Sequence, residues 1–174
     1  YEYPSAQPRV ASDSLKHDLY RRDYSVNAMA VALNPEIWGT LVDYFGGRRD
    51  LRYHTLRVLH NLSFVEDPTR VFRGVRLEQR LGFRLEDTTL RLLKTCVQSG
   101  MLGMLSGVRL RSEVELLLQE EHPLKAVRRL TSLGAWEMVF SGFSFGLRGS
   151  FAMRRLSALW RLTKEDLPDF GRDR

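Results

Sequence analysis

Arginines recur at helical spacing after an acid near residue 67, and their types suit recognition of an anion. Asp67 is followed by Arg70, Arg73 and Arg76, and at about 100° per residue these side chains form one slowly winding strip along a helix. Guanidiniums on one strip repel one another unless an anion neutralises them, and their planar fork matches phosphate oxygens. The strip therefore predicts a triphosphate or an RNA backbone as ligand. A row of arginines is also typical of a solvated helix face.

The helix that carries this strip is expected to span residues 68–81. Pro68 favours the first helical position, and the Asp67 carboxylate can accept hydrogen bonds from the free backbone N–H groups there. Gly82 is expected to end the helix. On the strip side, Arg80 is expected to be an ordinary surface charge. Apolar residues on the opposite face are expected to pack into the core: Val71, Phe72, Val75, Leu77 and Leu81.

Two further segments combine polar side chains with turn-forming residues. Arg21, Arg22, Asp23 and Asn27 precede an apolar stretch, which is typical of a helix C-terminus with basic residues and of a turn fixed by Asp23 and Asn27. Residues 42–51 contain two adjacent glycines followed by two arginines. A phosphate-binding turn and a hinge are both consistent with that segment.

The hydrophobic pattern around these segments predicts an α+β protein. A short helix is expected over residues 14–20, with strands over 27–33 and 40–45 at the edge of an α/β unit. From Asp67 onward the pattern is helical throughout, with helices over 68–81, 85–98, 112–119, 123–133 and 150–163. Aromatic side chains at Trp136, Phe140, Phe143 and Phe145 are expected to be core rather than interface.

The bulk composition excludes several classes of protein. With 174 residues and 43% hydrophobic content, the chain can bury a core and is not disordered. The net charge of +6 favours a phosphate-bearing partner. A single Cys96 excludes an internal disulfide and a cysteine-built zinc site, and its apolar neighbours predict a buried thiol. No apolar run is long enough for a membrane span and no signal pattern is present, so neither membrane insertion nor secretion is expected. The single cysteine fits a reducing cytoplasm, and the start at Tyr1 without an initiator Met predicts a piece of a longer protein.

Three segments in this order resemble the motifs of the bacterial tRNA nucleotidyltransferase and poly(A) polymerase family, in its class II branch. They are Arg-Arg-Asp-Tyr-Ser-Val-Asn-Ala-Met-Ala at 21–30, Asp-Tyr-Phe-Gly-Gly-Arg-Arg-Asp-Leu at 43–51, and Glu-Asp-Pro-Thr-Arg-Val-Phe-Arg-Gly-Val-Arg at 66–76. Residues 107–118 resemble the helical motif that follows in the family. The resemblance implies the C-terminal part of a nucleotidyltransferase head at 1–60, a helical neck with a nucleotide-recognition helix at 61–140, and the start of a helical body or tail at 141–174.

The resemblance also implies site residues and partners. Nucleotide-binding roles are implied for six residues: Arg22, Asp23, Asp67, Arg70, Arg73 and Arg76. Supporting roles are implied for three others: Arg21, Asn27 and Glu66. Asp67 and Arg70 would read the base edge of ATP or CTP, the other arginines would bind phosphates, and Asp23 would contact the sugar or fix Arg22. Such enzymes add AMP or CMP to the 3′ end of tRNA or another RNA. The motifs do not distinguish A-adding, CCA-adding and poly(A) polymerase members.

Members of the family hold Mg²⁺ with an Asp-x-Asp pair, and this chain contains no such pair. Its one acid-x-acid pair, Glu113 and Glu115, lies in a helical pattern that points the two side chains about 200° apart. No catalytic or metal-binding residue is therefore implied here, and Mg²⁺ would be held elsewhere in the full-length enzyme. The segment by itself is expected not to catalyse. The alternative is a helical RNA- or phosphate-binding module with no chemistry of its own.

Overall fold

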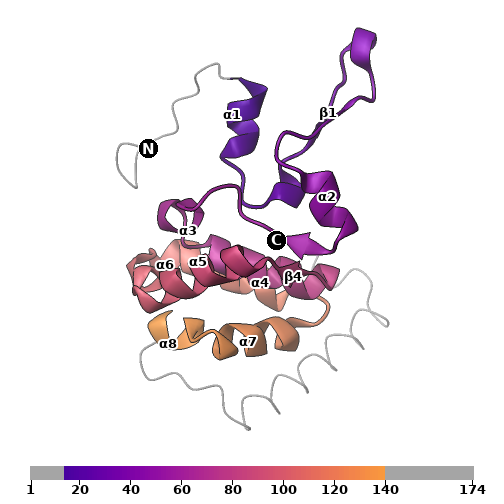
Figure 1. Ribbon diagram of the computed structural model, residues 1–174. Helices are drawn as coiled ribbons and strands as arrows, with labels where there is room; N and C mark the ends of the chain where they lie inside the picture. The colour runs from indigo at the N-terminus through magenta and orange to yellow at the C-terminus, as the bar shows by residue number, and fades with distance from the viewer. Residues whose placement is uncertain (1–13, 140–174) are drawn as a thin grey trace.

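Short helices and strands form the first part of the computed structural model, which describes residues 14–139 (Figure 1). These elements are α1 (Leu15–Tyr20), η1 (Ser25–Asn27), β1 (Ala30–Val31), η2 (Pro35–Ile37), β2 (Leu41–Val42), α2 (Gly47–Arg52) and β3 (Thr55–Leu56). The Ser14 side chain caps α1 by accepting from the His17 backbone N–H, which confirms the expected helix. β1 and β2 lie within the two predicted strand ranges, but each is only two residues long, and they form an antiparallel hairpin with Ala30 opposite Val42.

Helices dominate the second part, which confirms the α+β class. Its elements are α3 (Ser63–Glu66), α4 (Arg70–Leu81), β4 (Arg84–Leu85), α5 (Asp87–Gln98), η3 (Met101–Met104), α6 (Gly107–Leu118), α7 (Pro123–Ser132) and α8 (Ala135–Val139). Figure 1 shows α3 to α6 in a middle layer, with α1, α2 and the hairpin above and α7 and α8 below. β4 pairs in parallel with β3, which ties the helical layer to the first part. Among the described residues, none of the helices is long and apolar enough to cross a membrane.

Three expected boundaries are wrong for local reasons. α4 begins at Arg70 rather than Pro68, because the Asp67 carboxylate accepts from both the backbone N–H and the hydroxyl of Thr69 and holds a turn there. α6 begins at Gly107 rather than residue 112, because Ser106 caps it. α5 begins at Asp87 rather than residue 85, because Leu85 belongs to β4 and pairs with Leu56 of β3. The end of α4 at Gly82, with a φ of 65°, is as predicted.

The core is built on the apolar face of α4. Val71, Phe72, Val75 and Leu77 are buried as expected, whereas Leu81 at the helix end is 42% exposed. Cys96 is buried, as predicted, and its burial raises the pKa of the thiol to about 11. Trp136 is also buried in this core. The other expected aromatic core residues and the helix over 150–163 lie outside the described residues.

Tyr24 joins η1 to α4 and so fixes the two polar segments relative to each other. Its side chain is fully buried, and its hydroxyl donates to the Arg70 carbonyl over 2.8 Å. Burial raises the pKa of this hydroxyl far above its usual range, so it remains a donor. Gly74 faces the same ring, and a Cβ there would collide with the Tyr24 hydroxyl. The close approach of η1 to α4 therefore requires glycine at this position.

The glycine pair at 46–47 begins a helix that the pattern did not predict. Gly46 has a φ of 77°, and the Asp43 carboxylate accepts from the backbone N–H groups of Gly47 and Arg48 at 2.8 and 3.0 Å. Gly47 lies against the Ser25 carbonyl and the Met29 side chain, where a Cβ would collide. α2 is thereby packed directly on η1.

Asp43→Asn is expected to lower the free energy of unfolding by about 1 kcal/mol at pH 7, the scale of a lost helix cap. Partial burial opposes ionisation of Asp43, but the backbone N–H groups of Arg48 and Gly47 outweigh it and hold its pKa below the usual 3.8. A lowered pKa stabilises the folded state above pH 3.8, and this contribution is lost as the pH falls further. Thermal unfolding at pH 7 and at pH 3 checks the sign. An equal difference in the free energy of unfolding between wild type and variant at both pH values would contradict this prediction.

Candidate functional site

An open cavity of about 470 Å³ lies between the segment that follows α1 and the start of α4. Its lining residues come from those two segments: Arg21, Arg22, Asp23, Asn27, Asp67, Arg70 and Arg73. All of them belong to the set that the motif resemblance implies. The two remaining members lie elsewhere: Arg76 lines a different cavity, and a carboxylate oxygen of Glu66 lies 3.3 Å from Nε2 of His60.

Asp67 presents one carboxylate oxygen more freely than the other. Oδ1 accepts from the Thr69 backbone N–H and hydroxyl, and it accepts from Arg109 of α6 over 2.8 Å. Oδ2 has only Arg73 nearby, with its Nη1 3.8 Å away, which is beyond hydrogen-bond distance. The carboxylate is thus held in a fixed orientation through Oδ1, while Oδ2 remains available as an acceptor at the cavity.

Arg70 is buried, with 7% of its surface exposed, and its guanidinium is mostly engaged by the protein. Nη1 donates to the carbonyl and hydroxyl of Ser63, and Nη2 donates to the Arg21 carbonyl over 2.9 Å. Nε is buried and has no hydrogen-bond partner among the described residues. An unpaired buried N–H is costly. The guanidinium of Arg70 therefore links the chain segments through Nη1 and Nη2 and keeps one unpaired donor, Nε.

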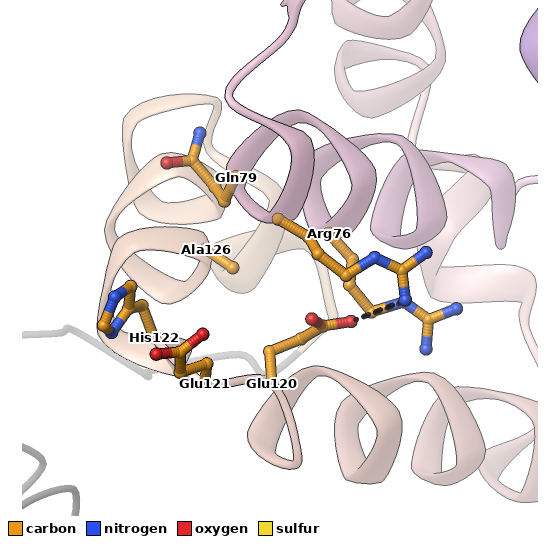
Figure 2. A pocket seen from close by; sticks show the side chains of 7 residues that line it. Arg76, Gln79, Glu120, Glu121, His122 and Ala126 are labelled. Carbon is orange, nitrogen blue, oxygen red and sulfur yellow. Dashed lines mark ion pairs between the residues drawn. The ribbon is translucent and has the colours of Figure 1, made fainter.

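The arginines along α4 are neutralised by carboxylates of the protein itself, which corrects the expectation that they need an external anion. Glu113 on α6 lies 3.6 Å from Arg73. Glu120, just after α6, lies 3.5 Å from Arg76 (Figure 2), and it lies 3.6 Å from Arg80. Because α6 packs along α4, its acids face the strip. Repulsion among the α4 arginines is therefore no evidence for a polyanion.

Asp23 and Asn27 fix the turn that leads into η1, as the pattern of polar residues in that segment predicted. The Asp23 carboxylate accepts from the Tyr24 backbone N–H at 2.8 Å and from the Asn27 amide at 3.1 Å. Arg21 and Arg22 both pair with Asp18, at 3.0 and 3.6 Å, and remain about half exposed or more. Asp23 forms no ion pair with Arg22 among the described residues, so it does not orient that arginine.

α6 contributes residues that the sequence reasoning missed. Arg109 pairs with Asp67, and Glu113 pairs with Arg73. Side chains of one helix, α6, therefore hold both of these cavity residues. Burial raises the pKa of Glu113, although Arg73 and Arg76 lower it, and its Oε2 has no hydrogen-bond partner in the described part of the chain. The available signal was Ser106 as a helix cap, which places Arg109 and Glu113 one turn apart on a single helix face.

The described residues offer no ligand set for a metal ion: no three or more His, Cys, Asp or Glu side chains gather between residues 14 and 139. Glu113 and Glu115 have different partners, Arg73 for the first and Arg111 for the second, as the helical spacing predicted. The cavity offers four arginines against two aspartates and one amide, and each aspartate accepts its hydrogen bonds within the protein through Oδ1. Such a set suits a ligand that combines negative charge with a polar edge.

Two families of known proteins match the chain over separate ranges. The Poly A polymerase head domain family matches residues 1–57, and the family described as the probable RNA and SrmB-binding site of polymerase A matches residues 82–145. An A-adding tRNA nucleotidyltransferase of Geobacter sulfurreducens is 57% identical over 77% of this chain.

Solved structures agree with these matches. A Thermotoga maritima CCA-adding enzyme complexed with tRNA is 46% identical, with a TM-score of 0.79 over 87% of this chain. A CCA-adding enzyme in complex with ATP is 45% identical, with a TM-score of 0.80 over 90% of this chain. The chain spans 15% of the Geobacter protein and 37% of each of the two solved chains.

Proposed function

We propose, from the premise that the chain belongs to the class II tRNA nucleotidyltransferase family, that it supplies nucleotide recognition to an enzyme that adds AMP or CMP to the 3′ end of tRNA. The observation that carries the proposal is that one cavity brings together both motif segments, from Arg21 to Asn27 and from Asp67 to Arg73. Related proteins named as A-adding and CCA-adding enzymes, and a relative solved with tRNA, support the reaction class. An enzyme of tRNA processing would act in the cytoplasm.

The free oxygen of Asp67 supports selection of adenine and cytosine. Both bases carry an exocyclic amino group that donates a hydrogen bond, whereas guanine and uracil carry a carbonyl oxygen at the corresponding position. Asp67 Oδ2 would accept from that amino group, and a shift of the buried Arg70 side chain would let its unpaired Nε donate to the base. A guanine or uracil carbonyl at the same place would face the carboxylate oxygen and be repelled.

The exposed arginines of the cavity would bind the triphosphate. Arg22 pairs with Asp18 over 3.6 Å and Arg73 pairs with Glu113 over 3.6 Å, both long contacts that a phosphate can replace. Arg21 lies beside them with its side chain 63% exposed. Arg76 is left out of this proposed site, because it lines another cavity and is paired with Glu120.

Mg²⁺ enters the proposal only as an ion held outside the described residues. They provide no group of acids that fits a divalent cation. We therefore assign residues 14–139 no part in holding the metal, and we expect the segment given by residues 1–174 not to transfer a nucleotide on its own. Its own contribution is to select the base and to place the triphosphate.

An extension assay tests the proposed function. The full-length protein would be incubated with Mg²⁺ and tRNA that lacks its terminal nucleotides, with one of the four nucleoside triphosphates at a time. Extension with ATP or CTP and none with GTP or UTP is the expected result. Extension with all four, or with none, would overturn the proposal.

A further inference from the structure

We infer that the exposed face of α2, formed by Arg48, Arg49 and Arg52, binds backbone phosphates of the RNA substrate. Together with Asp43 and Tyr53, these arginines line an open cavity of about 420 Å³ that shares no lining residue with the nucleotide cavity. All three arginines are exposed. The inference rests on the proposed function for the identity of the polyanion.

Most of the charge on this face is left uncompensated by the described residues, in contrast to the charge on α4. Arg48 and Arg52 form no ion pair with a carboxylate of the described residues, whereas Arg73, Arg76 and Arg80 each face one. Arg48 and Arg52 stand four residues apart, so they project from the same side of the helix. A positive face that the protein does not neutralise attracts a polyanion over the distance of a Debye length.

The two acids nearest to this face are already committed. Both oxygens of Asp43 accept backbone N–H groups at the start of α2. Asp50 is buried, and it binds Ser25 at 2.6 Å and Arg57 at 2.7 Å, which leaves only a 3.5 Å contact to Arg49. Neither acid competes effectively with a phosphate for the exposed guanidiniums.

RNA fits this face better than a free triphosphate does. The arginines extend over more than one helical turn rather than converging on a point, and Tyr53 beside them is 64% exposed and can stack on an unpaired base. α2 also packs on η1, which carries Asn27 of the nucleotide cavity. An RNA whose 3′ end enters that cavity can therefore place an upstream phosphate on α2.

Salt-dependent tRNA binding by the full-length protein tests this inference. Fluorescence anisotropy from 50 to 200 mM salt would compare wild type with the Arg48→Ala/Arg52→Ala variant. Loss of two phosphate contacts is expected to weaken tRNA binding about tenfold at low salt, and to reduce the slope of log K against log salt by about 1.4 to 1.8. The charge-preserving Arg48→Lys/Arg52→Lys variant is the matched control. It is expected to retain most of the tRNA affinity and most of the salt slope.

The remaining outcomes separate this inference from the proposed function. Calorimetric titration with ATP is expected to give the same affinity for wild type and the alanine variant. Unchanged tRNA affinity and salt slope in the alanine variant would overturn the inference, as would a loss of ATP affinity alone, which indicates a triphosphate site. Wild-type protein that binds tRNA with this salt dependence but extends it with no nucleotide would overturn the proposed function and leave the inference standing.

Discussion

Asp67→Ala is expected to reduce the preference of the full-length protein for ATP and CTP over GTP and UTP by about fivefold to about 150-fold. This range corresponds to the 1 to 3 kcal/mol by which one well-made polar contact discriminates among bases. The reason is that Oδ2 of Asp67 is the acceptor left free at the cavity, while Oδ1 is held by Arg109 and Thr69. Calorimetric titration with each of the four triphosphates measures the ratio.

The ratio of affinities, rather than any single affinity, is the quantity that tests Asp67. Removal of this carboxylate also frees Arg109 and Arg73, and the added positive charge is expected to raise the affinity for every triphosphate to a similar degree. Asp87→Ala is the matched control, because Asp87 is an exposed acid at the start of α5 and does not line the cavity. An Asp67→Ala protein with the wild-type preference would show that another group selects the base.

Arg70→Ala is expected to destabilise the region around the site by about 2 to 4 kcal/mol. The variant leaves the carbonyls of Ser63 and Arg21 without their donor and opens a cavity beneath the turn. Amides between residues 63 and 74 are therefore expected to exchange hydrogen about 30-fold to about 1000-fold faster, since tenfold in rate corresponds to about 1.4 kcal/mol. Hydrogen exchange read by mass spectrometry on the full-length protein measures this segment directly.

Two variants make the Arg70 prediction specific. Arg70→Lys keeps the charge but lacks the fork that reaches Ser63 and Arg21 together, so it is expected to recover only part of the protection. Arg80→Ala removes an arginine of the same helix that is 52% exposed and only 3.6 Å from Glu120, and it is expected to change exchange little. Equal exchange in Arg70→Ala and Arg80→Ala would contradict a structural role for Arg70.

The sequence predicted local structure well where short-range chemistry decides the outcome. The residues that line the 470 Å³ cavity come from two motif segments, and each segment forms its own turn: Asp67 closes one on Thr69, and Asp23 closes the other on Tyr24 and Asn27. The start of α4 was misplaced by two residues, because the Asp67 turn delays the helix. The stop at Gly82 follows from local backbone preference and was correct.

Tertiary packing decided the features that the sequence did not predict. The acids that neutralise Arg73 and Arg76 stand about 40 residues later in the chain, on and just after α6, and only the packing of α6 on α4 brings them into reach. Arg70 was expected on an exposed strip, but the approach of η1 through Tyr24 buries it. Periodicity places side chains on a helix face, but it does not specify what packs against that face.

A crystal structure of the full-length protein with a bound non-hydrolysable ATP analogue tests the central claim most directly. The predicted result is an adenine base in the cavity between α1 and α4, with its amino group about 3 Å from Asp67 Oδ2 and the triphosphate beside Arg22 and Arg73. An adenine bound elsewhere, with Asp67 still engaged only by Arg109, Thr69 and Arg73, would contradict the assignment of this cavity as the nucleotide site.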